Sequence, residues 1–215
     1  MGIPVGCFAA GIMVGIPIIE LLVNLIPLII LAVLLVIGLM KVPNLCVKIF
    51  RILTIGIKIF ITFGIVIGII HFLTGYEILH HTAPIEEAVI TVLNVSVVMS
   101  GTFPLVHIVS RLCRKPLMFI GKKIGINEIS TMGFLATTTT CVTTFSMMKN
   151  MDERGAVLNS AFAVSAASIF AGHLAFTMSF EEGFVPSVIV GKLVAGIFSV
   201  GLAWFAVRKG NRYSE

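Results

Sequence analysis

Charged residues are scarce in this 215-residue sequence, where Asp, Glu, Lys and Arg together fill only 12% of the positions. Soluble domains carry about twice that share, so the composition excludes an ordinary water-soluble fold. Hydrophobic residues make up 58% of the chain, and the mean hydropathy is +1.10. These values indicate an integral membrane protein with the lipid bilayer as its surroundings.

Cysteine is also rare, and its spacing excludes two site classes. Cys7, Cys46, Cys113 and Cys141 are scattered without pairs, so neither a disulfide framework nor a zinc site is indicated. The histidines and glutamates between positions 71 and 87 match no closed metal site. Enzyme signatures such as HExxH, GxSxG and the P-loop are missing. We therefore expect no metal, no other cofactor and no enzymatic activity.

The net charge of +5 comes from basic residues that are unevenly distributed. Connections 74–87 and 179–183 contain no Lys or Arg. The basic residues form three main clusters: Lys41, Lys48, Arg51 and Lys58; Arg111, Arg114, Lys115, Lys122 and Lys123; and Arg208, Lys209 and Arg212. Because cytoplasmic loops are enriched in Lys and Arg, we assign the clusters to the cytoplasmic side. This explanation removes the reason to expect a nucleic-acid partner.

Apolar stretches of about 17 to 25 residues can cross a hydrocarbon core of roughly 30 Å. The sequence has six: 3–19, 21–40, 59–75, 88–110, 156–178 and 184–207. We predict an all-α polytopic protein, with residues 1–215 forming a single membrane domain in the cytoplasmic membrane.

A threonine-rich tract interrupts the apolar sequence between Ala136 and Phe145. Its hydroxyls belong to Thr137, Thr138, Thr139, Thr140, Thr143 and Thr144. If this segment crossed the membrane, the C-terminal basic cluster would face outward, against the distribution of the other clusters. We therefore predict a re-entrant hairpin over 129–149, with the threonines at its tip and both chain termini cytoplasmic.

A polar tract at membrane depth is a functional-site hypothesis. Half-helix ends at a hairpin tip offer free N–H and C=O groups to a solute. The alternative is an ordinary span whose threonines bond their own i−4 carbonyls, with the basic C-terminal segment as an exception to the charge rule.

The fifth predicted span carries a stripe of small and polar residues. Asn159, Ala163, Ala166, His173 and Thr177 share one helical face, which suits either a cavity wall or a close helix contact. His173 is the proton-sensitive group there, although a packed, hydrogen-bonded histidine also explains it.

Lys192 lies roughly eight residues inside the last span, and none of the acidic residues lies clearly within a span. Its ammonium must therefore snorkel to the interface or pair with another polypeptide.

Several motifs together resemble the ethanolamine-utilisation transporter family. They run from Arg114-Lys115-Pro116-Leu117-Met118 and Ile126-Asn127 through Met147-Met148-Lys149-Asn150-Met151-Asp152-Glu153-Arg154-Gly155, Asn159 and the block from Ala161 to Ala167, to Gly172-His173-Leu174 and Val190-Gly191-Lys192-Leu193. The chain departs from the family pattern at Thr140-Cys141-Val142-Thr143 and at Gly172, where members carry Asn-Asn-Ile-Pro and Asp.

The resemblance implies one half, the C-terminal one, of an inverted-repeat transporter for a small polar solute such as ethanolamine. The six threonines, Asn159 and His173 would line the path, and Lys192 would lie behind them. The missing half implies a first-half polypeptide or a second copy of the chain as partner, or else that the chain is a fragment of a longer gene product. The alternative is a non-transporting accessory or degenerate subunit.

Overall fold

The computed structural model describes residues 1–76 and 84–210, and every regular element within these ranges is helical. The all-α prediction is therefore confirmed for the described part of the chain. The chain divides into two compact units. One unit is Ile29–Leu93, and the other joins Met1–Leu28 to the chain from Asn94 onward.

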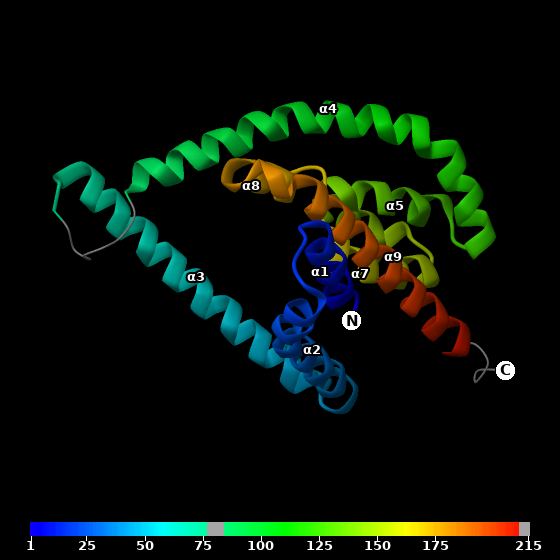
Figure 1. The fold of residues 1–215 in the computed structure, drawn as a ribbon. Helices are drawn as coiled ribbons and strands as arrows, with labels where there is room; N and C mark the ends of the chain where they lie inside the picture. The colour runs from blue at the N-terminus through cyan, green and yellow to red at the C-terminus, as the bar shows by residue number, and fades with distance from the viewer. Residues whose placement is uncertain (77–83, 211–215) are drawn as a thin grey trace. The chain divides into compact units, whose positions relative to one another are not determined.

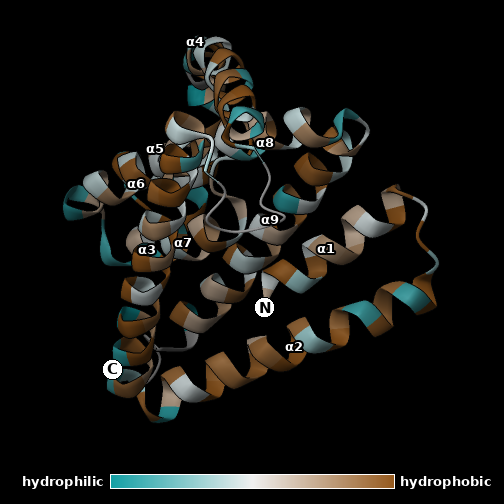
Figure 2. Ribbon diagram, turned by 90° about the vertical axis from the view of Figure 1, so that its left-hand side faces the viewer, coloured by the Kyte–Doolittle hydropathy of each residue, from teal (hydrophilic) through white to brown (hydrophobic). Residues whose placement is uncertain are grey.

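Four helical segments are long and apolar enough to cross a membrane: Ile18–Lys41, Pro43–Thr74, Ile85–Val109 and Glu182–Arg208. The first two are α2 and α3, and the third is the beginning of α4 (Ile85–Ile124). Figure 2 shows hydrophobic residues along the length of α2 and α3. Many of these side chains are uncovered, with Phe60 in α3 80% exposed. Such surfaces require lipid or protein around them, as expected of a multi-pass membrane protein.

Two of the six predicted spans differ from the sequence expectation. The segment 3–19 holds α1 (Gly2–Met13), whose 12 residues reach only about 18 Å. It ends before Gly15, which has a left-handed φ of 83°, and before Pro17. The segment 156–178 is two helices, α7 (Glu153–Ala166) and α8 (Gly172–Phe180), separated by a non-helical stretch at 167–171. The prediction of one uninterrupted helix over 156–178 is thus wrong.

The larger unit is centred on α9 (Val185–Gly210), which follows the short helix η2 (Glu182–Phe184). Helices α1 and α7 both pack against α9, and Figure 1 shows α1 lying beside it. The α1 contact is close because it uses glycine: a Cβ on Gly6 would lie 2.3 Å from the carbonyl oxygen of Gly191. Phe162, Ala166 and Ile169 form the buried apolar cluster of this unit.

Local signals explain where α4 ends and the following helices begin. Gly125 adopts a left-handed φ of 78°, and the Ile126 N–H donates to the Gly121 carbonyl oxygen at 3.1 Å, which is a glycine-based helix stop. α5 (Glu128–Thr139) follows, then α6 (Cys141–Met147) and the short helix η1 (Met148–Asn150). Thr140 separates α5 from α6 in an extended conformation.

Candidate functional site

Helices α5 and α7 begin side by side at a shared capping cluster. Asn127 caps α5 by accepting from the Ser130 N–H at 2.7 Å, and Asp152 caps α7 by accepting from the Gly155 N–H at 3.0 Å. The other oxygen of Asp152 accepts from the Asn127 N–H at 2.9 Å and from the Ser130 hydroxyl at 2.6 Å. The Asn127 side-chain amide donates to the Asn150 carbonyl at 3.1 Å. The chain therefore leaves Asn127, passes through α5 and α6, and returns to its starting point.

The Asp152 carboxylate is the charged centre of this cluster. Partial burial raises its pKa, but hydrogen bonds from Ser130 and from the Asn127 and Gly155 backbones outweigh that effect, so the pKa is lowered from 3.8. A carboxylate that accepts several hydrogen bonds is favoured in its charged form, so Asp152 holds the two helix starts together as an anion at neutral pH.

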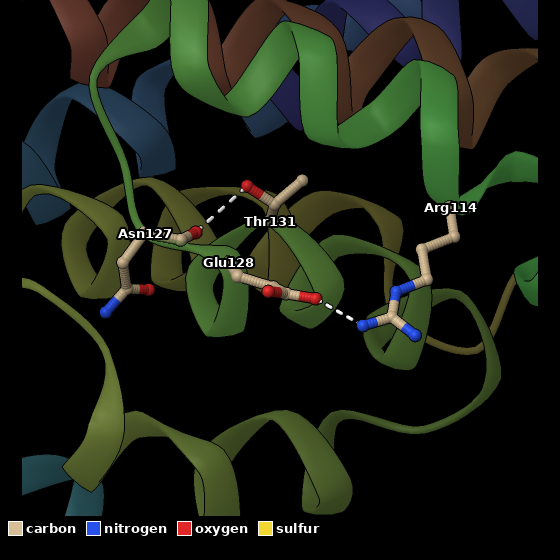
Figure 3. A network of polar contacts seen from close by, with 4 residues as sticks. All are labelled: Arg114, Asn127, Glu128 and Thr131. Carbon is tan, nitrogen blue, oxygen red and sulfur yellow. Dashed lines mark hydrogen bonds and ion pairs between the residues drawn. The ribbon is translucent and has the colours of Figure 1, made fainter.

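The end of α4 is tied to the same place. Figure 3 shows the ion pair between Arg114 in α4 and Glu128 in the first turn of α5, and the bond from the Thr131 hydroxyl to the Asn127 carbonyl oxygen. Thr131 also packs closely on Gly121, since a Cβ on that glycine would lie 2.0 Å from the Thr131 hydroxyl oxygen. The capping cluster around Asn127 and Asp152, which forms the base of the α5–α6 hairpin, is thereby held against α4.

Asn159 lies fully buried between α5 and α7. Its side-chain nitrogen donates to the carbonyl oxygens of Ser130 at 2.8 Å and Gly155 at 2.9 Å. Its side-chain oxygen has no hydrogen-bond partner among the described residues, and a Cβ on Gly133 would lie 2.4 Å from it. Asn159 thus fastens two helices, and Gly133 leaves the space that its amide occupies.

The threonine tract lies where α6 folds back on α5. Thr137 and Thr144 are fully buried, and their hydroxyl oxygens are 2.8 Å apart. Both also reach the Gly133 carbonyl, Thr137 at 2.9 Å and Thr144 at 3.3 Å. The Thr138 hydroxyl bonds to the carbonyl of Leu135 at 2.7 Å. The i−4 bond of Thr137 is the one expected of an ordinary span, but here it accompanies a break in the helix.

The remaining threonines of the tract are less buried, and their hydroxyls make fewer hydrogen bonds. Thr139 and Thr140 are half-buried and Thr143 is exposed. The hydroxyl oxygen of Thr140 accepts from the Val142 N–H at 3.3 Å, whereas the hydroxyls of Thr139 and Thr143 bond to nothing within the described ranges. These three hydroxyls therefore take no part in the contact that holds α6 against α5.

The break at 167–171 contacts the end of α5 through its backbone. The Ser168 N–H donates to the Thr137 carbonyl oxygen at 2.9 Å, and the Phe170 N–H donates to the Thr138 carbonyl oxygen at 3.0 Å. Ser168 adopts a left-handed φ of 57°, which is unusual for a residue with a side chain. Two interrupted helical segments therefore meet at their interruptions.

Because of this break, the stripe predicted from Asn159 to Thr177 does not lie on one helix. His173 belongs to α8, is exposed, and has its Nδ1 3.0 Å from the Ala167 carbonyl oxygen across the break. Asn159 instead faces the interior of the α5–α7 pair. No breaker such as proline marks 167–171 in the sequence, whereas the caps Asn127 and Asp152 are recognisable helix starts.

Lys192 lies apart from the threonine tract, on α9. It lines a cavity of about 280 Å³ between α1, α7 and α9, together with Ile3, Gly6, Cys7, Ala10, Val164, Ser165, Val188, Gly191 and Ala195. Among the described residues no carboxylate lies within 4 Å of its ammonium. Of the histidine- and glutamate-bearing loop considered for a metal, Glu77, His80 and His81 lie outside the described residues.

Comparison with known proteins gives a consistent picture. Residues 1–206 match the family described as "Ethanolamine utilisation protein, EutH". A "Probable ethanolamine permease EutH" of Listeria monocytogenes is 39% identical over 207 residues, covering 96% of this chain and 56% of that protein. The protein of the same name from Salmonella typhimurium is 34% identical over 230 residues, with the same shares covered.

A third relative is the "Uncharacterized protein YxeR" of Bacillus subtilis, which is 24% identical over 201 residues, covering 94% of this chain and 54% of that protein. No solved structure matches. The chain spans about half the length of the curated relatives it matches. With its sequence matched almost from end to end, the chain belongs to the EutH family of ethanolamine utilisation proteins.

Proposed function

We propose that this chain is the C-terminal half of a transporter that carries ethanolamine across the cytoplasmic membrane. The observation that carries the proposal is the meeting of two broken helices, where Ser168 and Phe170 donate their backbone N–H groups to the carbonyl oxygens of Thr137 and Thr138. Irregular backbone at membrane depth is tolerated only inside protein or beside a water-filled cavity. Discontinuous helices of this kind form the solute sites of many secondary transporters.

The chemistry of the hairpin tip suits protonated ethanolamine. The ammonium of that solute offers hydrogen-bond donors, and its hydroxyl both donates and accepts. Thr139, Thr140 and Thr143 supply hydroxyl oxygens that can accept from either group, and the adjacent helix ends supply carbonyls. His173, exposed beside the break, completes the set of polar groups that we assign to the path.

The other predicted site residues stabilise the helices around the proposed path. Thr137, Thr138 and Thr144 use their hydroxyls to hold the turn between α5 and α6. Asn159 uses its amide to hold α5 against α7. We therefore assign these four residues to the framework of the site and the tip hydroxyls to the solute.

We further propose that the α5–α6 hairpin dips into the membrane from the cytoplasm and returns. The hydrogen bonds that join Asn127 to Asn150 and Asp152 support entry and exit on one side. With both chain termini cytoplasmic, the proposal has six crossings: the segment 3–19 that contains α1, then α2, α3, the first part of α4, the interrupted pair α7 and α8, and α9. In this arrangement the chain is one of two inverted repeats.

A single repeat holds half of a midplane site, so the proposal includes a partner. A separately encoded first half, a second copy of this chain or the remainder of a longer gene product would supply the other half of the site. The Lys192 ammonium supports such a partner, because it lines a cavity without a carboxylate among the described residues and an unpaired ammonium in a span is costly.

The test is uptake of labelled ethanolamine into vesicles that contain this chain, alone and with each candidate partner. We expect uptake with the right partner, and we expect Thr139→Val with Thr140→Val to abolish it while membrane insertion stays intact. The matched control is Thr54→Val with Thr62→Val. These two α3 threonines bond to the carbonyls of Phe50 and Lys58 in their own helix, so their loss should leave uptake unchanged.

Two results would count against the proposal. Unchanged uptake in the Thr139 and Thr140 variant would refute the tip as the solute site. Absence of uptake with a first-half polypeptide and with the chain alone would favour the accessory-subunit alternative instead.

A further inference from the structure

Helix α4 continues well beyond its membrane-spanning part, and this extension is strongly basic. The candidate span is Ile85–Val109, whereas the helix runs to Ile124. Between positions 111 and 124 the chain has no acidic residue and five basic ones: Arg111, Arg114, Lys115, Lys122 and Lys123. Figure 1 shows α4 curved, and Pro104 and Pro116 lie inside it. A charged extension that directly follows a span lies near the membrane surface.

Most of this charge is uncompensated within the described part of the chain. The Arg114 guanidinium pairs with Glu128, but Arg111, Lys115 and Lys122 are exposed and form no ion pair with described residues. At 100° per residue, these three residues share one face of the helix. Arg114, Lys115, Met118, Phe119 and Lys122 also line a shallow pocket on the surface. The extension thus presents a basic face with a pocket lined by basic and apolar side chains.

Apolar side chains lie next to this basic face. Leu112 is 74% exposed and Phe119 is 68% exposed, and seven residues of separation place them on one helix face. The Lys123 ammonium lies 5.9 Å from the centre of the Phe119 ring. Lysine and arginine beside exposed leucine and aromatic residues is the pattern of a helix that lies in the membrane interface. A water-soluble acidic partner would leave the apolar stripe uncovered.

We propose that this α4 extension is a binding site for anionic phospholipids. Arg111, Lys115 and Lys122 bind the headgroup phosphates, while Leu112 and Phe119 lie among the upper acyl carbons. Clusters of basic residues next to a membrane span are attracted to anionic lipid. Because Arg114 and Gly121 hold the extension against α5, bound lipid would also brace the hairpin base. The proposal depends on the membrane setting and not on the identity of the solute.

The test reconstitutes the full chain in vesicles of phosphatidylcholine with added phosphatidylglycerol and measures the lipids that copurify with it. We expect enrichment of phosphatidylglycerol over the vesicle composition. The variant Arg111→Gln with Lys115→Gln and Lys122→Gln should lower that enrichment by roughly fivefold or more. The variant that keeps the charges, Arg111→Lys with Lys115→Arg and Lys122→Arg, should retain it.

The matched control removes three exposed positive charges elsewhere: Lys41→Gln, Lys58→Gln and Lys149→Gln. An equal loss of phosphatidylglycerol in this control would overturn the proposal, because general attraction to net charge would then explain the enrichment. A second arm adds inorganic phosphate to the vesicles. If phosphate alone displaces the lipid at comparable concentration, the basic face binds free anions and the lipid assignment fails.

Discussion

The backbone N–H of Ser168 donates a hydrogen bond of 2.9 Å to the carbonyl oxygen of Thr137. This bond joins the break between α7 and α8 to the end of α5. A helix end leaves carbonyl oxygens without intrahelical partners, and a non-helical stretch likewise leaves backbone N–H groups without partners. In this fold, backbone N–H groups of one interruption are satisfied by carbonyl oxygens at the other, so each break helps to stabilise the other.

The conformation of Ser168 gives the first prediction. Its left-handed φ of 57° costs a non-glycine residue about 1 kcal/mol. Ser168→Gly relieves this strain and keeps the N–H, so we expect thermal stability in detergent to be unchanged or raised. Ser168→Pro forces φ to about −65° and removes the donor, so we expect a loss of roughly 3 kcal/mol or more. Equal stability of the two variants would contradict the assigned junction.

The break itself could not be predicted from the sequence. Ala167 to Ala171 contains no proline, and the surrounding alanine-rich sequence favours a helix. The interruption depends on acceptors from α5, a segment about 30 positions earlier in the chain, and local propensity carries no information about them. The threonine tract, by contrast, is recognisable because hydroxyls are conspicuous in an apolar sequence.

Gly133 provides the second prediction. A Cβ at this position would lie 2.4 Å from the Asn159 side-chain oxygen and 2.6 Å from Met151 Cε. Gly133→Ala should therefore force α5 away from α7 and destabilise the fold by about 1–3 kcal/mol. Gly201→Ala is the control, because a Cβ there meets nothing within 4 Å. Thermal unfolding in detergent measures both, and equal midpoints would show that α5 and α7 are not packed as described.

The pKa of Asp152 predicts a pH dependence of stability. It is lower in the folded chain than its ordinary value of 3.8, so the stabilisation is complete above that value and is lost as pH falls through the folded pKa. Asp152→Asn removes one acceptor from the cluster of Asn127, Ser130 and Gly155. At neutral pH we expect this variant to lower the free energy of unfolding by about 1 kcal/mol. This value is below that of a buried charged hydrogen bond, because Asp152 is partly exposed to water.

The control for this prediction is to measure the stability of both proteins at neutral and at acidic pH. The difference between native protein and Asp152→Asn should shrink as pH falls below about 4, because the protonated carboxyl and the amide then offer similar hydrogen bonds. Thermal midpoints at neutral and acidic pH measure it. A difference that stays constant with pH would show that the charge of Asp152 does not hold the hairpin base.

The sequence is enough to propose where the site lies, but it does not assign a role to each residue of the proposed site. The threonines and Asn159 stand out by their polarity, but polarity does not distinguish a side chain that binds a solute from one that holds the framework. That distinction depends on contacts: Thr144 reaches Gly133, eleven residues earlier, only because α6 folds back. The caps Asn127 and Asp152 are recognisable as helix starts, whereas their mutual contact requires the folded hairpin.

The closed hairpin base leads to a prediction about membrane topology. In a chain whose native cysteines are replaced, single cysteines at Lys122, Lys149 and Glu182 can be probed with a thiol reagent that does not cross membranes. Because Asn127 contacts Asn150 and Asp152, the sites at Lys122 and Lys149 should lie on one side. We expect both to be labelled only after the cell membrane is opened, and the site at Glu182 to be labelled in intact cells.

The pair at Lys122 and Lys149 is the decisive comparison, since α5, α6 and η1 lie between them. If Lys149→Cys reacts from outside while Lys122→Cys is protected, the segment between them crosses the membrane. A crossing would separate its ends by roughly 30 Å, which is incompatible with the 2.9 Å bond between Asn127 and Asp152. The labelling result therefore tests both the capping cluster around Asn127 and Asp152 and the re-entrant path. The Gly133 and Asp152 variants test the packing of the helices independently of the membrane.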